Sequence, residues 1–318
     1  MQRYIARRLI VLIPTLLGVS IVTFALIHLI PGDALDALIG TQYALTEAQA
    51  AALRSYFGID KPLHVQYWVW LTSALQGDMG YSIRTGKPVL PQILAHYPLT
   101  LELTLLATVV AICIGLPIGM LSAVRTNSAL DLFGRFFALL GLSLPNFWLG
   151  TLIILVLSLY FRWLPNTGGY VDFFEDPLTN LKQLIFPALT LGTAMAAAVM
   201  RMTRSAMLEV LGQDYVRTAR SKGLSEWIVI SGHSLRNALI PVITIVAIQM
   251  GYLLGGTVIV EEIFSLPGVG RLTLNAIYQR DYAMVQAAIL FIAFNFVVIN
   301  LLADVAYGFT NPTIRYKE

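Results

Sequence analysis

Long stretches without charged side chains constrain the fold of this sequence more than any other feature. Residues 9–30, for example, contain no Asp, Glu, Lys or Arg, and a helix needs about 20 mostly apolar residues to cross a bilayer. Only 12% of the residues are charged, against about 25% in a soluble domain. The sequence therefore predicts an all-α integral membrane protein with six transmembrane helices. We place these helices at residues 9–30, 99–124, 133–160, 186–206, 238–260 and 285–308.

The distribution of Lys and Arg over the predicted loops indicates the orientation of the chain. Arg and Lys gather at the two termini, in residues 125–135 and in residues 201–237, which all fall on one side of six spans. The two short loops on the other side are net acidic, and the second of these acidic loops includes Glu261, Glu262 and Asp281. Because cytoplasmic loops carry the excess of basic residues, both termini are expected to be cytoplasmic.

The predicted spans divide the chain into three parts. Residues 1–30 comprise the N-terminus and the first transmembrane helix, because their apolar run exceeds the roughly 7–15 residues of a signal peptide. Residues 31–98 are expected to form a small external subdomain, with a helix-like stretch at 46–58 followed by the aromatic run "HVQYWVWL". Residues 99–318 form a core of five transmembrane helices, and a cytoplasmic loop at 207–237 separates the fourth helix from the fifth.

A short charged segment, "DYVRTARSKGL" at 214–224, interrupts this apolar core. Its pattern predicts a helix with Tyr215, Val216 and Ala219 on one face and with Gly223 in the left-handed position that ends a helix. A helix of about nine residues is too short to be stable alone in water. Its apolar face is therefore expected to dock on the protein, which leaves the basic face outward.

The basic face of this segment, with Arg217, Arg220 and Lys222, has two interpretations. It can satisfy the positive-inside rule and contact anionic lipid, or it can dock a cytoplasmic partner. The chain contains no GxxxxGK[ST] phosphate-binding loop, so if the protein uses ATP, another chain must bind it.

Other functional classes find little support in the composition. The net charge of +3 makes no case for a nucleic-acid partner. The single cysteine and the four histidines show no spacing typical of metal ligands, and no catalytic residues stand out. The sequence therefore predicts a chain that is not an enzyme and that holds no metal or cofactor of its own.

A second motif, "FSLPGVGR", lies between the last two predicted spans. Pro267 and Gly268 fit the central positions of a type II turn. This turn is expected on the external side, either as a tight loop or as a re-entrant element at the outer mouth of a transport path.

Four stretches of the chain resemble the B-type permeases of ABC importers of the dipeptide/oligopeptide/nickel family. "EVLGQDYVRTARSKGLSEWIVISGHSLRNALIP" is similar to the family's cytoplasmic loop with the EAA motif, although only Ala219 and Gly223 match the general form of that motif. "RRLIVLIPTLLGVSIVTFALIHLIPGD", "GIDKPLHVQYWVWLTSALQGDMGYSI" and the region from "EEIFSLPGVGRL" onward resemble the N-terminal, external and C-terminal parts of such permeases.

This resemblance implies a multi-pass subunit in the inner membrane of a prokaryote. It implies a second, C-type permease subunit, an extracytoplasmic solute-binding protein and two ATPase subunits that bind ATP and Mg²⁺. The segment at 214–223 would then be the coupling helix that sits in a cleft of the ATPase. An ATPase-independent secondary transporter or channel subunit is the alternative. The candidate coupling residues are Asp214, Tyr215, Arg217, Thr218, Ala219, Arg220, Lys222 and Gly223.

Overall fold

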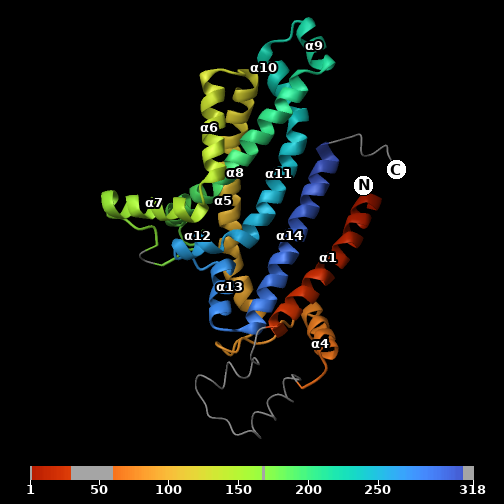
Figure 1. Ribbon diagram of the computed structural model, residues 1–318, viewed down its shortest axis with the longest axis vertical. Helices are drawn as coiled ribbons and strands as arrows, with labels where there is room; N and C mark the ends of the chain where they lie inside the picture. Colours follow the sequence, from red (N-terminus) through yellow and green to blue (C-terminus); the bar gives the residue numbers. More distant parts are fainter. Residues whose placement is uncertain (1, 30–59, 167–168, 311–318) are drawn as a thin grey trace.

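All regular elements in the described part of the chain are helical. The computed structural model describes residues 2–29, 60–166 and 169–310 (Figure 1). Four stretches within these ranges are long and apolar enough to cross a membrane. They are α5 (Val89–Val124), α8 (Pro177–Leu211), α14 (Tyr282–Thr310) and the run of α10 (Glu226–Ile228), η1 (Val229–Ser234) and α11 (Leu235–Gly256).

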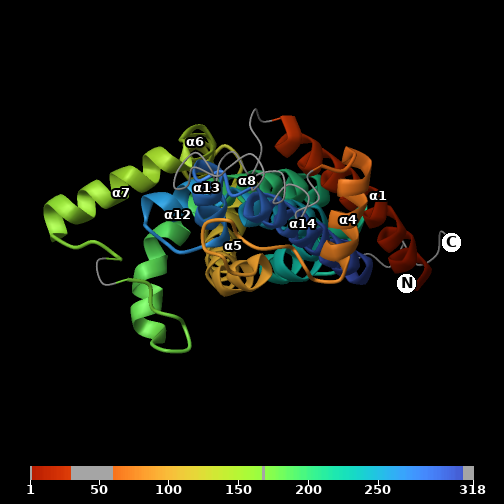
Figure 2. The same ribbon diagram turned by 90° about the horizontal axis from the view of Figure 1, so that it is seen from below.

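The predicted span 133–160 is not one helix. It divides into α6 (Ala129–Ser143) and α7 (Asn146–Phe161), which meet at an angle of 99°. Pro145 explains the break, because proline disfavours a helical conformation of the residue before it, and Leu144 is extended (φ −80°, ψ 125°). If the bent pair counts as one span, the described residues contain five candidate spans. Figures 1 and 2 show α7 projecting away from the other helices.

The close contact between α5 and α8 forms the centre of the molecule. Gly115 and Gly119 lie directly against the backbone of α8, where a Cβ atom on Gly119 would lie 2.6 Å from the carbonyl oxygen of Met200. The small residues of "GLPIG" at 115–119 therefore allow the two helices to approach closely. The buried cluster around it includes Leu103, Leu184, Leu191 and Leu266.

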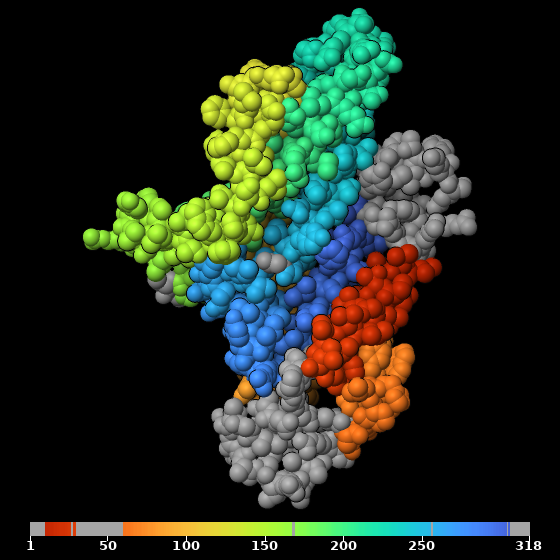
Figure 3. Space-filling view, in the orientation of Figure 1, coloured from red at the N-terminus to blue at the C-terminus, as the bar shows by residue number. Residues whose placement is uncertain are grey.

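Helix α1 (Gln2–Leu29) lies along α14, and α4 (Leu63–Leu75) packs beside α1 (Figure 3). The hydroxyl groups of Tyr67 and Ser20 are 2.8 Å apart, and the Tyr67 ring meets Phe24 edge to face. The aromatic run of α4 therefore packs on the first helix. The predicted helix-like stretch at 46–58 lies outside the described residues.

Short helices occupy the two ends of the molecule. α9 (Asp214–Ser221) lies at one end, here called the α9 end, while α12 (Val258–Ile263) and α13 (Val269–Tyr278) lead toward the opposite end, here called the α13 end (Figure 1). Around the α13 end, Asp281 accepts a hydrogen bond from the buried Ser82 hydroxyl, and the Arg84 Nε donates to the carbonyl of Gln279 at 2.8 Å. These hydrogen bonds connect the segment before α5 to the turn before α14.

We expect Gly119→Ala to lower the thermal stability of the purified protein. The added methyl group would overlap the backbone of α8, and overpacking of this kind costs about 1–3 kcal/mol. Gly18→Ala is the matched control, because a Cβ atom at position 18 has no neighbour within 4 Å. Thermal unfolding in detergent measures both variants, and equal midpoints would contradict the importance of the α5–α8 contact.

Candidate functional site in the loop between α8 and α11

The short helix α9 docks through Val216 and Ala219 of its predicted apolar face, whereas Tyr215, the third residue expected there, is exposed. Val216 is fully buried and Ala219 is 7% exposed, and both pack with the buried Val229 of η1. Val210 and Leu211 at the end of α8 complete this cluster. The support for α9 therefore comes from the two elements that flank it, and a helix that is too short to persist alone is held in a defined orientation.

The chain leaves α9 through a left-handed glycine, also as predicted. Gly223 has φ +78°. Its N–H donates to the carbonyl of Arg220 at 2.9 Å, and the N–H of Leu224 donates to the carbonyl of Ala219 at 3.4 Å. These two bonds make a Schellman motif, which satisfies the last carbonyl groups of the helix and reverses the chain toward α10.

The basic residues of α9 differ in whether their charge is exposed to a partner or paired within the loop. Arg217 has a side chain that is 72% exposed and forms a long ion pair of 3.5 Å with the exposed Asp214. Arg220 instead binds Glu226 on α10 at 2.8 Å, and so part of its charge is used within the loop. Lys222 is exposed at the end of the helix. Arg217 and Lys222 therefore form the outward cationic surface of the loop.

Two further candidate residues stabilise the loop through hydrogen bonds. The exposed Tyr215 accepts a hydrogen bond from the side-chain amide of Asn237 on α11 at 2.7 Å, and thereby links α9 to the next long helix. The Thr218 hydroxyl donates to the carbonyl of Asp214 at 2.9 Å within the helix. In the described part of the chain, no group of three or more His, Cys, Asp or Glu side chains is placed to hold a metal ion.

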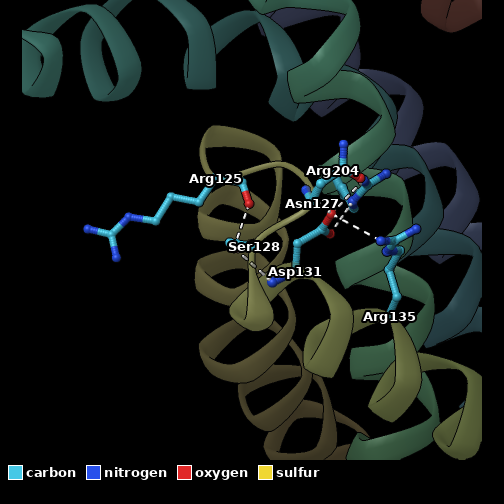
Figure 4. A network of polar contacts seen from close by, with 6 residues as sticks. All are labelled: Arg125, Asn127, Ser128, Asp131, Arg135 and Arg204. Atoms are coloured by element: carbon cyan, nitrogen blue, oxygen red, sulfur yellow. Dashed lines mark hydrogen bonds and ion pairs between the residues drawn. The ribbon is translucent and has the colours of Figure 1, made fainter.

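An ion pair with a buried carboxylate joins α6 to α8 near this loop (Figure 4). The Asp131 carboxylate is completely buried and accepts hydrogen bonds from the Nε and Nη2 of Arg204 at 2.7 and 3.0 Å. Arg135 lies 3.5 Å from the same carboxylate. The Asn127 N–H also donates to Asp131 at 3.0 Å, from a left-handed residue (φ 59°). Figure 4 shows the Arg125 side chain pointing away from this group.

This ion pair was not predicted from the sequence. Arg204 appeared there only as one of the basic residues of the cytoplasmic side, and Asp131 fell outside the predicted spans. Arg204 lies in α8, two turns before the helix ends at Leu211 and the chain enters α9. A bidentate pair with a buried carboxylate fixes geometry well, so the α5–α6 turn and the last turns of α8 are held together.

We expect Gly223→Ala to loosen α9 without unfolding the protein. Alanine is disfavoured at φ +78°, at a cost of about 1 kcal/mol. Hydrogen exchange of the α9 amides should therefore accelerate severalfold. Gly212→Ala is the control, because Gly212 at the end of α8 has φ −81° and an added Cβ meets only ordinary contacts. Unchanged exchange in Gly223→Ala would contradict the role of the glycine.

We expect Asp131→Asn to destabilise the protein by about 3 kcal/mol, since removing one partner of a buried ion pair leaves the other charge unpaired. Asp214→Asn removes a carboxylate whose side chain is 97% exposed, and its effect should stay below about 1 kcal/mol. Thermal unfolding compares the two variants. If Asp131→Asn were as stable as Asp214→Asn, the ion pair of Asp131 would not contribute to the stability of the fold.

Comparisons with known proteins cover the whole length of the chain. Residues 115–316 match the family model described as "binding-protein-dependent transport system inner membrane component", and residues 1–104 match the model of its N-terminal part. The glutathione transport system permease protein GsiC of Salmonella typhimurium is 42% identical over 318 residues, with 100% of both chains covered.

Two dipeptide permeases are also similar. The dipeptide transport system permease proteins DppB of Alkalihalophilus pseudofirmus and of Escherichia coli K12 are 42% and 39% identical, and the alignments cover 99% and 100% of this chain and 100% of each relative. A solved amino acid ABC transporter shares 16% identity at a TM-score of 0.46, over 69% of this chain and 92% of that one. The two family-model matches and the full-length similarity to these permeases show that the chain belongs to the family of inner membrane components of binding-protein-dependent transport systems.

Proposed function

We propose that this permease subunit moves short peptides or closely related small solutes across the membrane as part of an ABC importer. The names of its full-length relatives support this substrate class, because they specify glutathione, itself a tripeptide, and dipeptides. The single observation that carries the proposal is the identity of 39–42% over the entire chain.

The proposed topology has six spans, with the α9 end in the cytoplasm. The four long spans, the bent α6–α7 pair and α1 would supply them. The excess of Arg and Lys around the α9 end supports this orientation. Both termini would then be cytoplasmic, and the α13 end would face the extracytoplasmic solute-binding protein from which the family takes its name.

In the proposed mechanism, ATP hydrolysis in two partner ATPase subunits acts on this chain through α9, and a second permease subunit completes the transport path. α9 is exposed on one face and packed against α8 and η1 on the other. A displacement of α9 would therefore move the end of α8 together with η1, which leads into α11. The Asp131–Arg204 pair would carry the same displacement into α6. Coupling of this kind needs packed elements with two arrangements.

The outward cations Arg217 and Lys222 are the proposed contacts with acidic residues of the ATPase. Arg220 plays a different part in this proposal: its bond to Glu226 holds the turn after α9, so a substitution there disturbs the loop itself. Arg217 is therefore the better probe of the interface than Arg220.

We expect Arg217→Glu to reduce the amount of ATPase subunits that co-purify with the tagged chain by tenfold or more, since like charges across an interface cost several kcal/mol. The measurement is a pull-down from the native membrane in mild detergent, with mass spectrometry of the bound proteins. The wild-type eluate should also contain a second permease subunit. A solute-binding protein recovered in the same eluate would indicate which solute the transporter carries.

Arg162→Glu is the matched control for this experiment. Arg162 is an exposed arginine at the end of α7, away from α9 (Figure 1), and its reversal should leave the ATPase subunits bound. Equal losses in both variants would refute the docking role of α9. A wild-type chain recovered without any ATPase, under conditions that preserve a known ABC complex, would refute the importer and favour a secondary transporter.

A further inference from the structure

Glu261 is a carboxylate that is fully buried between three helices. It lies in α12, between the end of α11 and the start of α13, and its side chain has no exposed surface. Burial of a charged group is costly unless hydrogen bonds or an opposite charge compensate it. Within the described ranges, no Lys or Arg side chain forms an ion pair with this carboxylate, and Arg271 directs its guanidinium to Glu262 at 3.0 Å.

Hydrogen bonds from three elements take the place of a cation. Oε1 accepts from the hydroxyl groups of Thr100 on α5 and of Thr257 before α12, each at 2.8 Å. Oε2 accepts from the backbone N–H of Arg271 in the first turn of α13 at 2.8 Å. The carboxylate also lies at the N-terminus of α13, where the helix dipole favours negative charge. All these donors are in place only when α5, α12 and α13 meet.

Thr100 completes this junction from the side of α5. Its hydroxyl donates to Glu261 and accepts from the N–H of Val269 at 2.9 Å. Two of the N–H groups that the start of α13 leaves without helical partners are thus satisfied by side chains, one of them directly from α5.

Gly268 shows how little space the junction leaves. The predicted type II turn is wrong, because Gly268 has φ −95° and ψ 176°, an extended conformation that any residue can adopt. The glycine is needed for room instead: a Cβ atom there would lie 2.2–2.4 Å from the carboxylate atoms of Glu261. The backbone at position 268 can therefore pass this close to the Glu261 carboxylate only because it carries no side chain.

From this geometry we infer that Glu261 is the positioning residue that holds α13 against α5, and that opening of the α13 end requires its carboxylate to exchange the Thr100 hydroxyl for water. The contact with Thr100 is the bond between α5 and the α12–α13 segment, while the bonds to Thr257 and Arg271 remain within that segment. A separation of α13 from α5 breaks the Thr100 bonds first. The charge of Glu261 then favours either a fully docked or a fully hydrated state over intermediate positions.

The direct test is hydrogen exchange of the α13 amides in the full-length chain, together with any subunits that co-purify with it, in lipid nanodiscs, followed by mass spectrometry. Glu261→Gln removes the charge and replaces one carboxylate oxygen by an N–H₂ group, which cannot accept a hydrogen bond from either the Arg271 N–H or the two threonine hydroxyls. Exchange in 266–278 should therefore rise about tenfold or more, as expected for loss of a hydrogen bond to a charged group. Glu262→Gln is the matched control: it weakens only the partly exposed pair with the Arg271 guanidinium, a kind of contact that contributes little to stability, and it should raise exchange far less than Glu261→Gln.

A second pair of variants keeps the test decisive if Glu261→Gln does not fold. Thr100→Val removes the hydroxyl at nearly constant volume and should accelerate the same exchange, whereas Thr100→Ser keeps the hydroxyl and should restore protection. Equal exchange in Glu261→Gln and Glu262→Gln, or in Thr100→Val and Thr100→Ser, overturns the inference.

The meaning of this junction for transport rests on the proposed function and has its own measurement. If α13 controls access, the exchange-accelerating variants should hydrolyse more ATP per molecule transported, while the Glu262→Gln ratio stays at the wild-type value. An unchanged ratio together with faster exchange would make Glu261 a purely structural anchor and overturn its role in transport. Because hydrogen exchange is measured on this chain whether or not ATPases are bound to it, failure of the importer proposal would leave the α13 result intact.

Discussion

The close approach of α5 and α8 is the constraint on which the rest of the structure depends. Gly115 and Gly119 on α5 and Gly192 on α8 let the two backbones meet, and lipid supplies little hydrophobic drive for helices to associate, so packing of this kind holds them together. Every site described above is attached to this pair. α9 directly follows α8 in the chain, and Asp131 lies in the first turn of α6, just after the loop that ends α5. Glu261 accepts a hydrogen bond from Thr100 of α5.

Hydrogen bonds and ion pairs at the two ends of this helix pair then determine what can move. At the α9 end, Arg204 and Asp131 join α8 to α6 through a bidentate contact. At the α13 end, Glu261 joins α5 to α13 without a cation. The proposed cycle uses the first as a firm connection and the second as a breakable one, because hydroxyl and amide donors are more easily replaced by water than a buried guanidinium.

Local sequence patterns predicted the helical segments and the α9 loop well, because those features depend on nearby residues. The apolar runs located the long helices, and Gly223 marked the end of α9. Pro145 lay inside a predicted span, and there the apolar pattern concealed a break. Asp131 and Glu261 could not be predicted, since their partners Arg204 and Thr100 are distant in the sequence and nothing local distinguishes a buried carboxylate from a loop acid.

The crowding between Gly268 and Glu261 has a consequence for how such chains can change in evolution. A side chain larger than hydrogen at 268 would occupy the space of the carboxylate, so it can be accepted only together with a shorter residue at 261. A shorter residue at 261 would in turn withdraw the acceptor from the first turn of α13. The two positions are therefore expected to vary as a pair among relatives, and chains that have lost both should hold α13 by a different set of contacts.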